Sequence, residues 1–298
     1  MLEKYTFTGS PTARFHQEVF VSHAASEGLH LPQEIPHSPE REEQISALEA
    51  ELVSFVRNEF DLDVSGRLIS HDRIRFFQPS EWGRVRKRYG MPFWEKGFFT
   101  GEGIVVGEQP QSLNVLGHQL VHHVSSMTVQ LRREDNQPRA ISYRTGYKNG
   151  KNQSLAVIEE ALTEITNQEV LERARKNPVL MKIPTSLAHK HHVILFDELV
   201  KQIAADKGKG YQAVLRELQR GKITGDMSVL RTITEVIGKE RMKYLAKFHP
   251  GNRDGVSRVA AALGLNGAVL KLQDYNRGRS VPVLENVLEA PLLVSIAT

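Results

Sequence analysis

The order of the predicted elements limits the fold of this chain more than any other feature of its sequence. Short strand-like runs alternate with helical runs up to about residue 150, whereas from about residue 185 to Pro282 the apolar spacing is almost entirely helical and is interrupted by glycines. A mixture of strands and helices followed by helices alone is typical of an α+β fold. We therefore expect a small mixed sheet with helices packed on it, followed by a helical second lobe.

Local signals place the individual elements. Ser38 and Pro39 supply an N-cap and a first-turn proline for a helix over 39–60. Strands are predicted at 67–70, 73–77, 98–99, 103–107 and 140–144, and further helices at 79–89, 111–128 and 154–176. Three domains follow from this pattern: an N-terminal arm over 1–38, a domain over 39–180 that carries the sheet, and a helical C-terminal lobe over 181–298.

The composition removes several classes of function. The chain has no cysteine, so disulfides, thiolate zinc sites and cysteine nucleophiles are excluded, and a metal ion would need His, Asp or Glu ligands. A net charge of +4 is too small an excess to imply a nucleic-acid partner. No stretch approaches the roughly 20 apolar residues that span a bilayer, and the start lacks an apolar signal region. We therefore expect a cytoplasmic protein with no membrane partner.

Two histidines lie four residues apart within the helix predicted over 111–128. Residues at this spacing project from one face of a helix, so the imidazoles of His118 and His122 can reach one zinc ion. The pair alone is a weak signal, because 12 histidines in 298 residues produce roughly half such a pair by chance. His123 points about 100° away from His122, so we expect it to pack or to support the site rather than to bind metal.

Two glutamates in phase on the next predicted helix strengthen the metal hypothesis. A catalytic zinc ion usually takes three protein ligands and one water, and two helical histidines with a carboxylate from a neighbouring helix form a recurrent set. Glu160 is the expected third ligand. Glu164 lies one turn later on the same face, and we expect it to accept a hydrogen bond from a ligating histidine and so fix the tautomer of that ring.

These two segments, GHQLVHH at 117–123 and EEALTE at 159–164, resemble the gluzincin family of zinc metallopeptidases. That family carries HExxH on one helix and a downstream glutamate on the next. The resemblance covers about residues 65–175 and implies a zincin-like domain, with an active-site helix and a glutamate helix, in which His118, His122 and Glu160 hold Zn²⁺. It also implies a peptide or protein substrate that pairs with an edge strand at 103–107 and is hydrolysed by a zinc-activated water.

One residue departs from the family pattern. Gln119 follows the first histidine, where the family has the glutamate that takes a proton from zinc-bound water and delivers it to the leaving amine. A glutamine amide neither accepts nor donates a proton near pH 7, so we expect zinc and substrate to bind while hydrolysis is disabled. An engineered change from glutamate to glutamine is the favoured explanation, and a natural pseudopeptidase is the alternative.

A transition-state oxyanion also needs a hydrogen-bond donor beside the metal. Tyr143 and Tyr147 lie near the turn before the glutamate helix and are the preferred candidates for this role. Four histidines of the second lobe are further candidates: His189, His191, His192 and His249.

Two other functions stay open. The arginines and aromatic residues over 67–89 could stack on bases while their cations follow phosphates, as in a nucleic-acid-binding module, although a solvated face around core aromatics is preferred. Zinc could also staple two helices of a protein without catalysis, which would require a fourth protein ligand.

Overall fold

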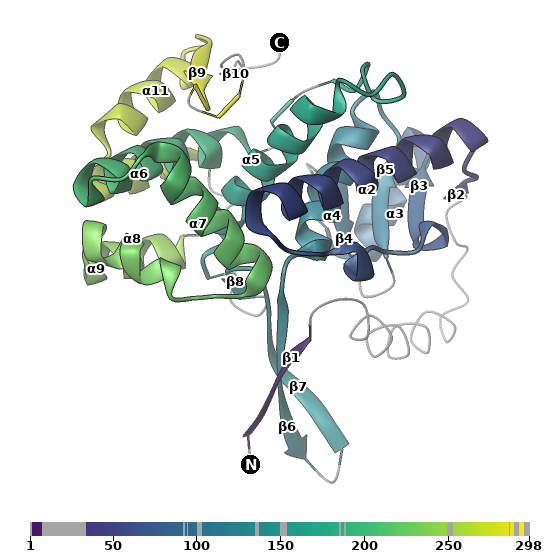
Figure 1. Ribbon diagram of the computed structural model, residues 1–298, viewed down its shortest axis with the longest axis horizontal. Helices are drawn as coiled ribbons and strands as arrows, with labels where there is room; N and C mark the ends of the chain where they lie inside the picture. Colours follow the sequence, from purple (N-terminus) through teal and green to yellow (C-terminus); the bar gives the residue numbers. More distant parts are fainter. Residues whose placement is uncertain are drawn as a thin grey trace. The chain divides into compact units, whose positions relative to one another are not determined.

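The structure is a computed structural model of the chain (Figure 1). It describes residues 2–7, 34–91, 93, 95–99, 103–134, 137–149, 154–184, 186–187, 189–248, 253–285, 287–288 and 292–294. The predicted N-terminal arm over 1–38 lies largely outside these residues, and the predicted boundaries at 38 and 180 stay predictions.

Two compact units make up the chain. The sheet unit comprises Phe7–Val124 and Val170–Ser186. The helical unit comprises Met1–Thr6, Ser125–Glu169 and Leu187–Thr298. Together they contain both strands and helices, so the expected α+β class is confirmed.

A four-stranded mixed sheet organises the sheet unit. Helix α4 (Ser112–Val124) packs on β4 and β5, and α3 (Pro79–Arg88) packs on β3. Strands β3 and β5 are parallel, whereas the outer pairs are antiparallel. All of β5 is buried, because it has a strand on each side and a helix against it. The strand order is β2 (Glu34–Ile35), β3 (Ile74–Phe77), β5 (Ile104–Gly107) and β4 (Gly97–Phe99).

Helix α2 (Pro39–Phe60) confirms the predicted helix over 39–60. The side chain of Ser38 accepts a hydrogen bond from Arg41 N at 3.2 Å, and Pro39 occupies the first turn, as the sequence indicates. The helix ends at Asp61, which adopts a left-handed conformation with φ of 55°. Its buried face contacts α4, and this face consists of Ile45, Leu48, Leu52, Phe55 and Val56.

The strand predicted at 67–70 is wrong. The chain makes two 3₁₀ turns instead, η1 (Ser65–Arg67) and η2 (His71–Arg73), and β3 begins only after them. The carboxylate of Asp63 accepts a hydrogen bond from Ser65 N at 2.9 Å, which supports the first of these turns, and the extended residues Leu68 and Ser70 between the turns belong to none of the described sheets.

The expected position of the edge strand is also wrong. Strand β5, which covers the segment 103–107, lies between β3 and β4 rather than at the border of the sheet. Among the described strands, β4 forms the border next to α4. A peptide that extends this sheet on that side would therefore have to pair with β4.

A long antiparallel hairpin begins the main part of the helical unit (Figure 1). Its strands are β6 (Met127–Glu134) and β7 (Gln137–Thr145), and β7 includes the strand predicted at 140–144. Strands β1 (Leu2–Phe7) and β8 (Lys148–Asn149) complete a sheet of order β1-β6-β7-β8. Because residues from Met127 pair with β7, α4 ends at Val124 and not at residue 128 as its apolar spacing suggests.

Apart from strands β9 and β10, the elements that the structure describes in the rest of this unit are helices, as predicted. Helix α6 packs against α7, α8, α10 and α11, and it is buried on several faces. Helices α6, α7 and α8 end at Gly208, Gly225 and Gly238, whose φ angles of 60°, 81° and 84° favour glycine. No helix in the described part of the chain has the length and apolar character needed to cross a bilayer. The elements are α5 (Ala156–Ala174, to Glu169 in this unit), α6 (Lys190–Lys207), α7 (Tyr211–Thr224), α8 (Val229–Ile237), α9 (Lys239–Lys247), α10 (Arg253–Leu263), α11 (Asn266–Asn276), β9 (Val281–Val283) and β10 (Leu292–Val294).

Histidines and glutamates tie α2 to η2 in the sheet unit. The Glu42 carboxylate lies 2.5 Å from His37 Nδ1 and 2.6 Å from His71 Nδ1, while His71 Nε2 lies 2.9 Å from Glu49. Two simultaneous bonds to carboxylates require the charged, doubly protonated ring of His71. Burial alone would lower the pKa of His71, but the bonds to Glu49 and Glu42 outweigh burial and raise it.

We expect the stabilisation from His71 to depend on pH. A raised pKa in the folded state means that this stabilisation is fully present below about pH 6.5, the ordinary pKa of histidine, and is lost as the pH rises through the folded pKa. The substitution His71→Gln should therefore lower the Tm more at about pH 6 than at about pH 9. Thermal unfolding followed by circular dichroism measures both differences, and equal differences would contradict the expectation.

Candidate metal centre

Helix α4 presents His118 and His122 on one face. The helix begins at Ser112, whose Oγ accepts a hydrogen bond from Gln109 N at 2.7 Å, and its last carbonyl, at Val124, accepts one from the Arg67 guanidinium at 2.8 Å. The two imidazole centroids are 4.9 Å apart with an interplanar angle of 73°. His118 is buried and His122 is partly exposed, so one edge of the pair lies nearer to solvent.

Helix α5 carries both predicted acids, and both are buried. Oε1 of Glu160 lies 2.8 Å from Lys148 Nζ, and its Oε2 lies 3.6 Å from His189 Nε2. Glu164 is fully buried and accepts a hydrogen bond from the Gln168 amide at 3.1 Å. The proposed bond from Glu164 to a ligating histidine stays a prediction.

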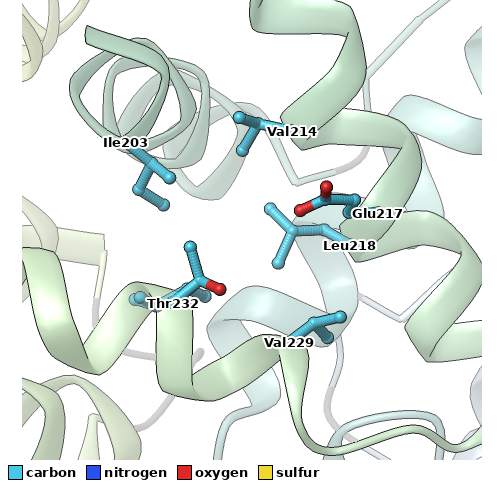
Figure 2. Close-up of a pocket in the computed structure, with 7 residues that line it drawn as sticks. Ile203, Val214, Glu217, Leu218, Val229 and Thr232 are labelled. Atoms are coloured by element: carbon cyan, nitrogen blue, oxygen red, sulfur yellow. The ribbon is translucent and has the colours of Figure 1, made fainter. Parts of the chain in front are cut away.

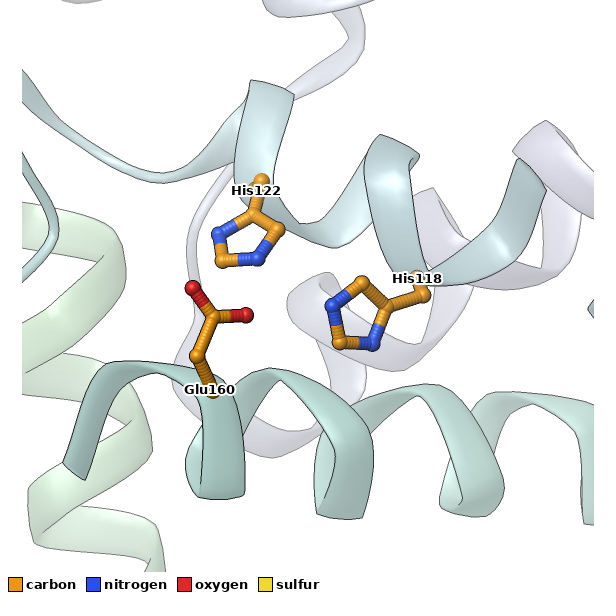
Figure 3. A group of neighbouring side chains, drawn as sticks. All are labelled: His118, His122 and Glu160. Atoms are coloured by element: carbon orange, nitrogen blue, oxygen red, sulfur yellow. The ribbon is translucent and has the colours of Figure 1, made fainter. Parts of the chain in front are cut away.

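The structure brings His118, His122 and Glu160 together, as the sequence predicts (Figure 3). One ligand atom from each of the three side chains lies within 4.8 Å of the other two, and Figure 3 shows the carboxylate facing both rings. Ligands at about 2.0–2.1 Å from one tetrahedral zinc ion are about 3.4 Å apart, so modest side-chain rotations would complete the coordination. Two imidazoles and one carboxylate suit zinc and other first-row divalent metals.

Gln119 has a structural partner of its own. Its side chain is 7% exposed, and its amide Nε2 donates a hydrogen bond to the carbonyl oxygen of Gly97 in β4 at 3.1 Å. Strand β4 approaches α4 closely here, since a Cβ at Gly97 would lie 2.5 Å from Val115 Cγ1. A glutamate carboxylate has no proton to donate to this carbonyl at neutral pH, so the contact requires an amide.

We expect Gln119→Glu to destabilise the metal-free protein. The substitution replaces a donated hydrogen bond by a buried carboxylate that faces a carbonyl oxygen, which should reduce the free energy of unfolding by about 1–3 kcal/mol at pH 7. Urea denaturation in the presence of a chelator measures the loss.

The matched control for this measurement is Gln119→Met, which removes the donor without adding a charge. It should cost less than Gln119→Glu. A Gln119→Glu protein as stable as the wild type would show that the bond to Gly97 does not hold β4 against α4.

Of the two preferred oxyanion donors, the structure describes the side chain of Tyr147 alone. Tyr147 is 1% exposed, and its hydroxyl donates to the carbonyl oxygen of Leu218 at 2.8 Å. Burial raises the pKa of Tyr147, with Glu159 and Asp226 adding to the shift. Tyr143 lies on β7 in register with Val129, and its side chain is outside the described residues. An oxyanion role for either tyrosine stays a prediction.

The remaining histidines near these elements make other contacts. The rings of His189 and His192 stack with centroids 5.5 Å apart, and His191 packs edge-on against Tyr275. His249 lies outside the described residues. His123 is buried against Phe99, as its direction on the helix suggests, and burial together with the charge of Arg73 lowers its pKa to about 4.

Sequence reasoning missed a buried ion pair next to Glu160. Glu159 is completely buried and pairs with Lys222 of α7 at 2.8 Å, a residue 63 positions later in the chain. No local sequence pattern predicts this pair, because the position of Lys222 is typical of an exposed lysine on an amphipathic helix.

The aromatic residues of the cluster over 67–89 pack inside the sheet unit. Trp82 stacks on Phe98 with centroids 5.7 Å apart, and Tyr89 lies 5.1 Å from the same ring. The hydroxyl of Tyr89 also accepts a hydrogen bond from Arg75 at 2.9 Å. These contacts favour the interpretation of core aromatics below a solvated basic face over that of a base-stacking surface.

A small hollow among α6, α7 and α8 is almost wholly apolar (Figure 2). Glu217 and Thr232 are its only polar lining residues, and the metal ligands do not contribute to it. It contains no set of groups that could perform catalysis. Its other lining residues are Ile203, Val214, Leu218, Val229 and Ile233.

Comparison of the chain with models of protein families, with curated proteins and with solved structures finds no match.

Proposed function

We propose that this protein binds zinc in a centre of the metallopeptidase type, with His118, His122 and Glu160 as ligands. The observation that carries the proposal is the approach of three ligand atoms to within 4.8 Å of one another, from the three residues that the sequence analysis selects as ligands. Three protein ligands leave a fourth position for water, which is the arrangement of catalytic rather than structural zinc sites.

The substrate class that we propose is a peptide or protein, and the domain that holds it is zincin-like. A zinc ion in this centre would acidify its water and polarise a substrate carbonyl. An extended peptide that adds to the sheet on this side would pair with the border strand β4, and the Gln119 amide lies at the Gly97 carbonyl of that strand. Substrate would thus be held next to Gln119.

Gln119 determines the expected activity. At this position a carboxylate would be the general base, but the amide cannot accept a proton and is already used as a donor to Gly97. We therefore propose that the protein binds its peptide and does not turn it over at an appreciable rate. The bond to Gly97 supports Gln119 as an integral part of this fold, and hence a natural pseudopeptidase over an engineered change.

A closed structural zinc site is the second candidate, and one distance favours it. His189 Nε2 lies 3.6 Å from Oε2 of Glu160, so this ring is within reach of the carboxylate that we assign to the metal. A rotation that brought His189 onto the ion would complete four protein ligands and remove the water.

We expect the purified protein to contain about one zinc ion per chain. Removing a residue that only supports a metal ligand typically lowers metal affinity by about 10–100-fold. Removing a ligand itself should cost at least as much, so His118→Ala and Glu160→Ala should each lower zinc affinity by about 100-fold or more. Elemental analysis and competition with a chromogenic chelator measure stoichiometry and affinity.

The control for zinc loss is His71→Gln, which removes a histidine that bonds to Glu42 and Glu49 and not to the triad. It should retain zinc. The variant His189→Ala separates the two candidates, since full retention supports the open site and loss of zinc supports the closed one. A wild-type protein without stoichiometric affinity for any first-row divalent metal would overturn both.

We expect Gln119→Glu to gain peptidase activity in the zinc-loaded state. General acid–base catalysis is typically worth about 100- to 10,000-fold, so cleavage of a quenched fluorescent peptide library should rise by a factor in this range. Gln119→Glu combined with Glu160→Ala is the control and should stay inactive. If zinc-loaded Gln119→Glu protein cleaves no peptide, the metallopeptidase proposal is contradicted. The zinc site would then belong to a zinc-binding protein without catalysis.

A further inference from the structure

Two adjacent glutamates on α5 have different environments in the helical unit. Glu159 is completely buried, whereas Glu160 is 7% exposed and is the residue assigned to the metal. Consecutive side chains of a helix point about 100° apart. The rotation of α5 about its own axis therefore sets the direction of both carboxylates, and with it the side chains that each carboxylate contacts. Something in the structure must fix that rotation.

Glu159 is held by a closed set of buried partners. Its Oε1 lies 2.8 Å from Lys222 Nζ, and its Oε2 accepts a hydrogen bond from Tyr147 N at 2.8 Å. Lys222 is 1% exposed and donates a further bond to Ser125 Oγ at 2.6 Å. Because a buried charge without a partner is costly, rotating α5 away from Lys222 would be strongly opposed.

The turn between β7 and β8 contacts both glutamates through successive residues. Tyr147 donates its backbone N–H to Glu159, and the side chain of the next residue, Lys148, reaches Oε1 of Glu160 at 2.8 Å. Gly146 allows this approach, since it has a φ of 53° and a Cβ there would lie 2.3 Å from Oε2 of Glu159. The position of the turn therefore sets the position of the ammonium group that holds Glu160.

The same turn is fastened to the helix that supplies Lys222. The Tyr147 hydroxyl donates to the carbonyl oxygen of Leu218, one helical turn before Lys222 on α7. Gly146 N also donates to the carbonyl oxygen of Ser126 at 2.8 Å. Helix α5, the β7–β8 turn and helix α7 thus meet at the Glu159–Lys222 pair.

We propose that the buried Glu159–Lys222 ion pair is a positioning element for the metal ligand Glu160. The pair fixes the rotation of α5 and the place of the β7–β8 turn, so that Lys148 holds Oε1 of Glu160 and the carboxylate is presented to the metal. This inference rests on the proposed zinc centre. Neither Glu159 nor Lys222 touches the metal, and their effect passes through Lys148 and the backbone of α5.

The test uses the full chain with Glu159→Gln, Lys222→Met and both changes together. Each single change leaves one buried charge without its partner and should lower the urea midpoint, whereas the double change removes both charges and should recover much of that loss. Zinc affinity should fall by about 10–100-fold in the single variants, as is typical when outer partners of a metal site are removed. It should stay low in the double variant even though stability returns.

The matched control is Glu169→Gln. Glu169 lies on the same helix as Glu159 and pairs with Arg216 of the same partner helix at 2.7 Å, but it is ten positions further along α5. This change should lower the urea midpoint and leave zinc affinity within about twofold of the wild type. Equal loss of affinity in Glu169→Gln would mean that general docking of α5 on α7 matters, and it would overturn the proposal.

Two further outcomes are decisive. Zinc affinity that recovers together with stability in the double variant would reduce the ion pair to a structural contact and overturn its positioning role. Crystal structures of the metal-free wild type and double variant test the same point without zinc: contact between Lys148 and Glu160 should persist in the first and be lost in the second. A wild type that binds no metal but shows this difference would refute the zinc proposal and support the positioning of Glu160.

Discussion

A buried charge must meet an opposite charge, and this requirement controls the arrangement around Glu160. Taking a carboxylate or an ammonium group out of water costs several kcal/mol, so Glu159 and Lys222 are tolerated inside the helical unit only as a hydrogen-bonded pair. The β7–β8 turn and helix α7 are organised around that pair through Tyr147. The carboxylate of Glu160, the next residue on α5, therefore contacts a different set of side chains.

The candidate centre combines two kinds of constraint. Helical spacing alone puts His118 and His122 on one face of α4, whereas Glu160 depends on how α5 is rotated. Lys148 bonds to one carboxylate oxygen, and this contact favours binding of a metal through the other. Because the comparisons find no match, the function proposed for this centre depends on its donor set and its geometry.

Gln119 connects the centre with the sheet. An amide at this position satisfies the Gly97 carbonyl at the border of the sheet, and a glycine there lets β4 approach α4. The same amide cannot perform the proton transfer that hydrolysis needs. One side chain thus favours close packing of strand on helix, and in the proposed metal centre it would disfavour turnover.

The sequence by itself determined the features that depend on neighbours in the chain. The helix over 39–60 follows from its cap and apolar spacing, the ends of α6, α7 and α8 follow from the glycines that interrupt the helical spacing, and the pairing of His118 with His122 follows from helical period. These are local because backbone hydrogen bonds and side-chain direction in a helix are fixed within about four residues.

The tertiary structure alone decided which distant segments meet. It ended α4 at Val124 by pairing β6 with β7, placed β5 inside the sheet rather than at its border, and buried Lys222 against Glu159. None of these follows from spacing, because hydrogen bonding between strands and charge compensation between helices depend on contacts that only form when remote parts of the chain pack together.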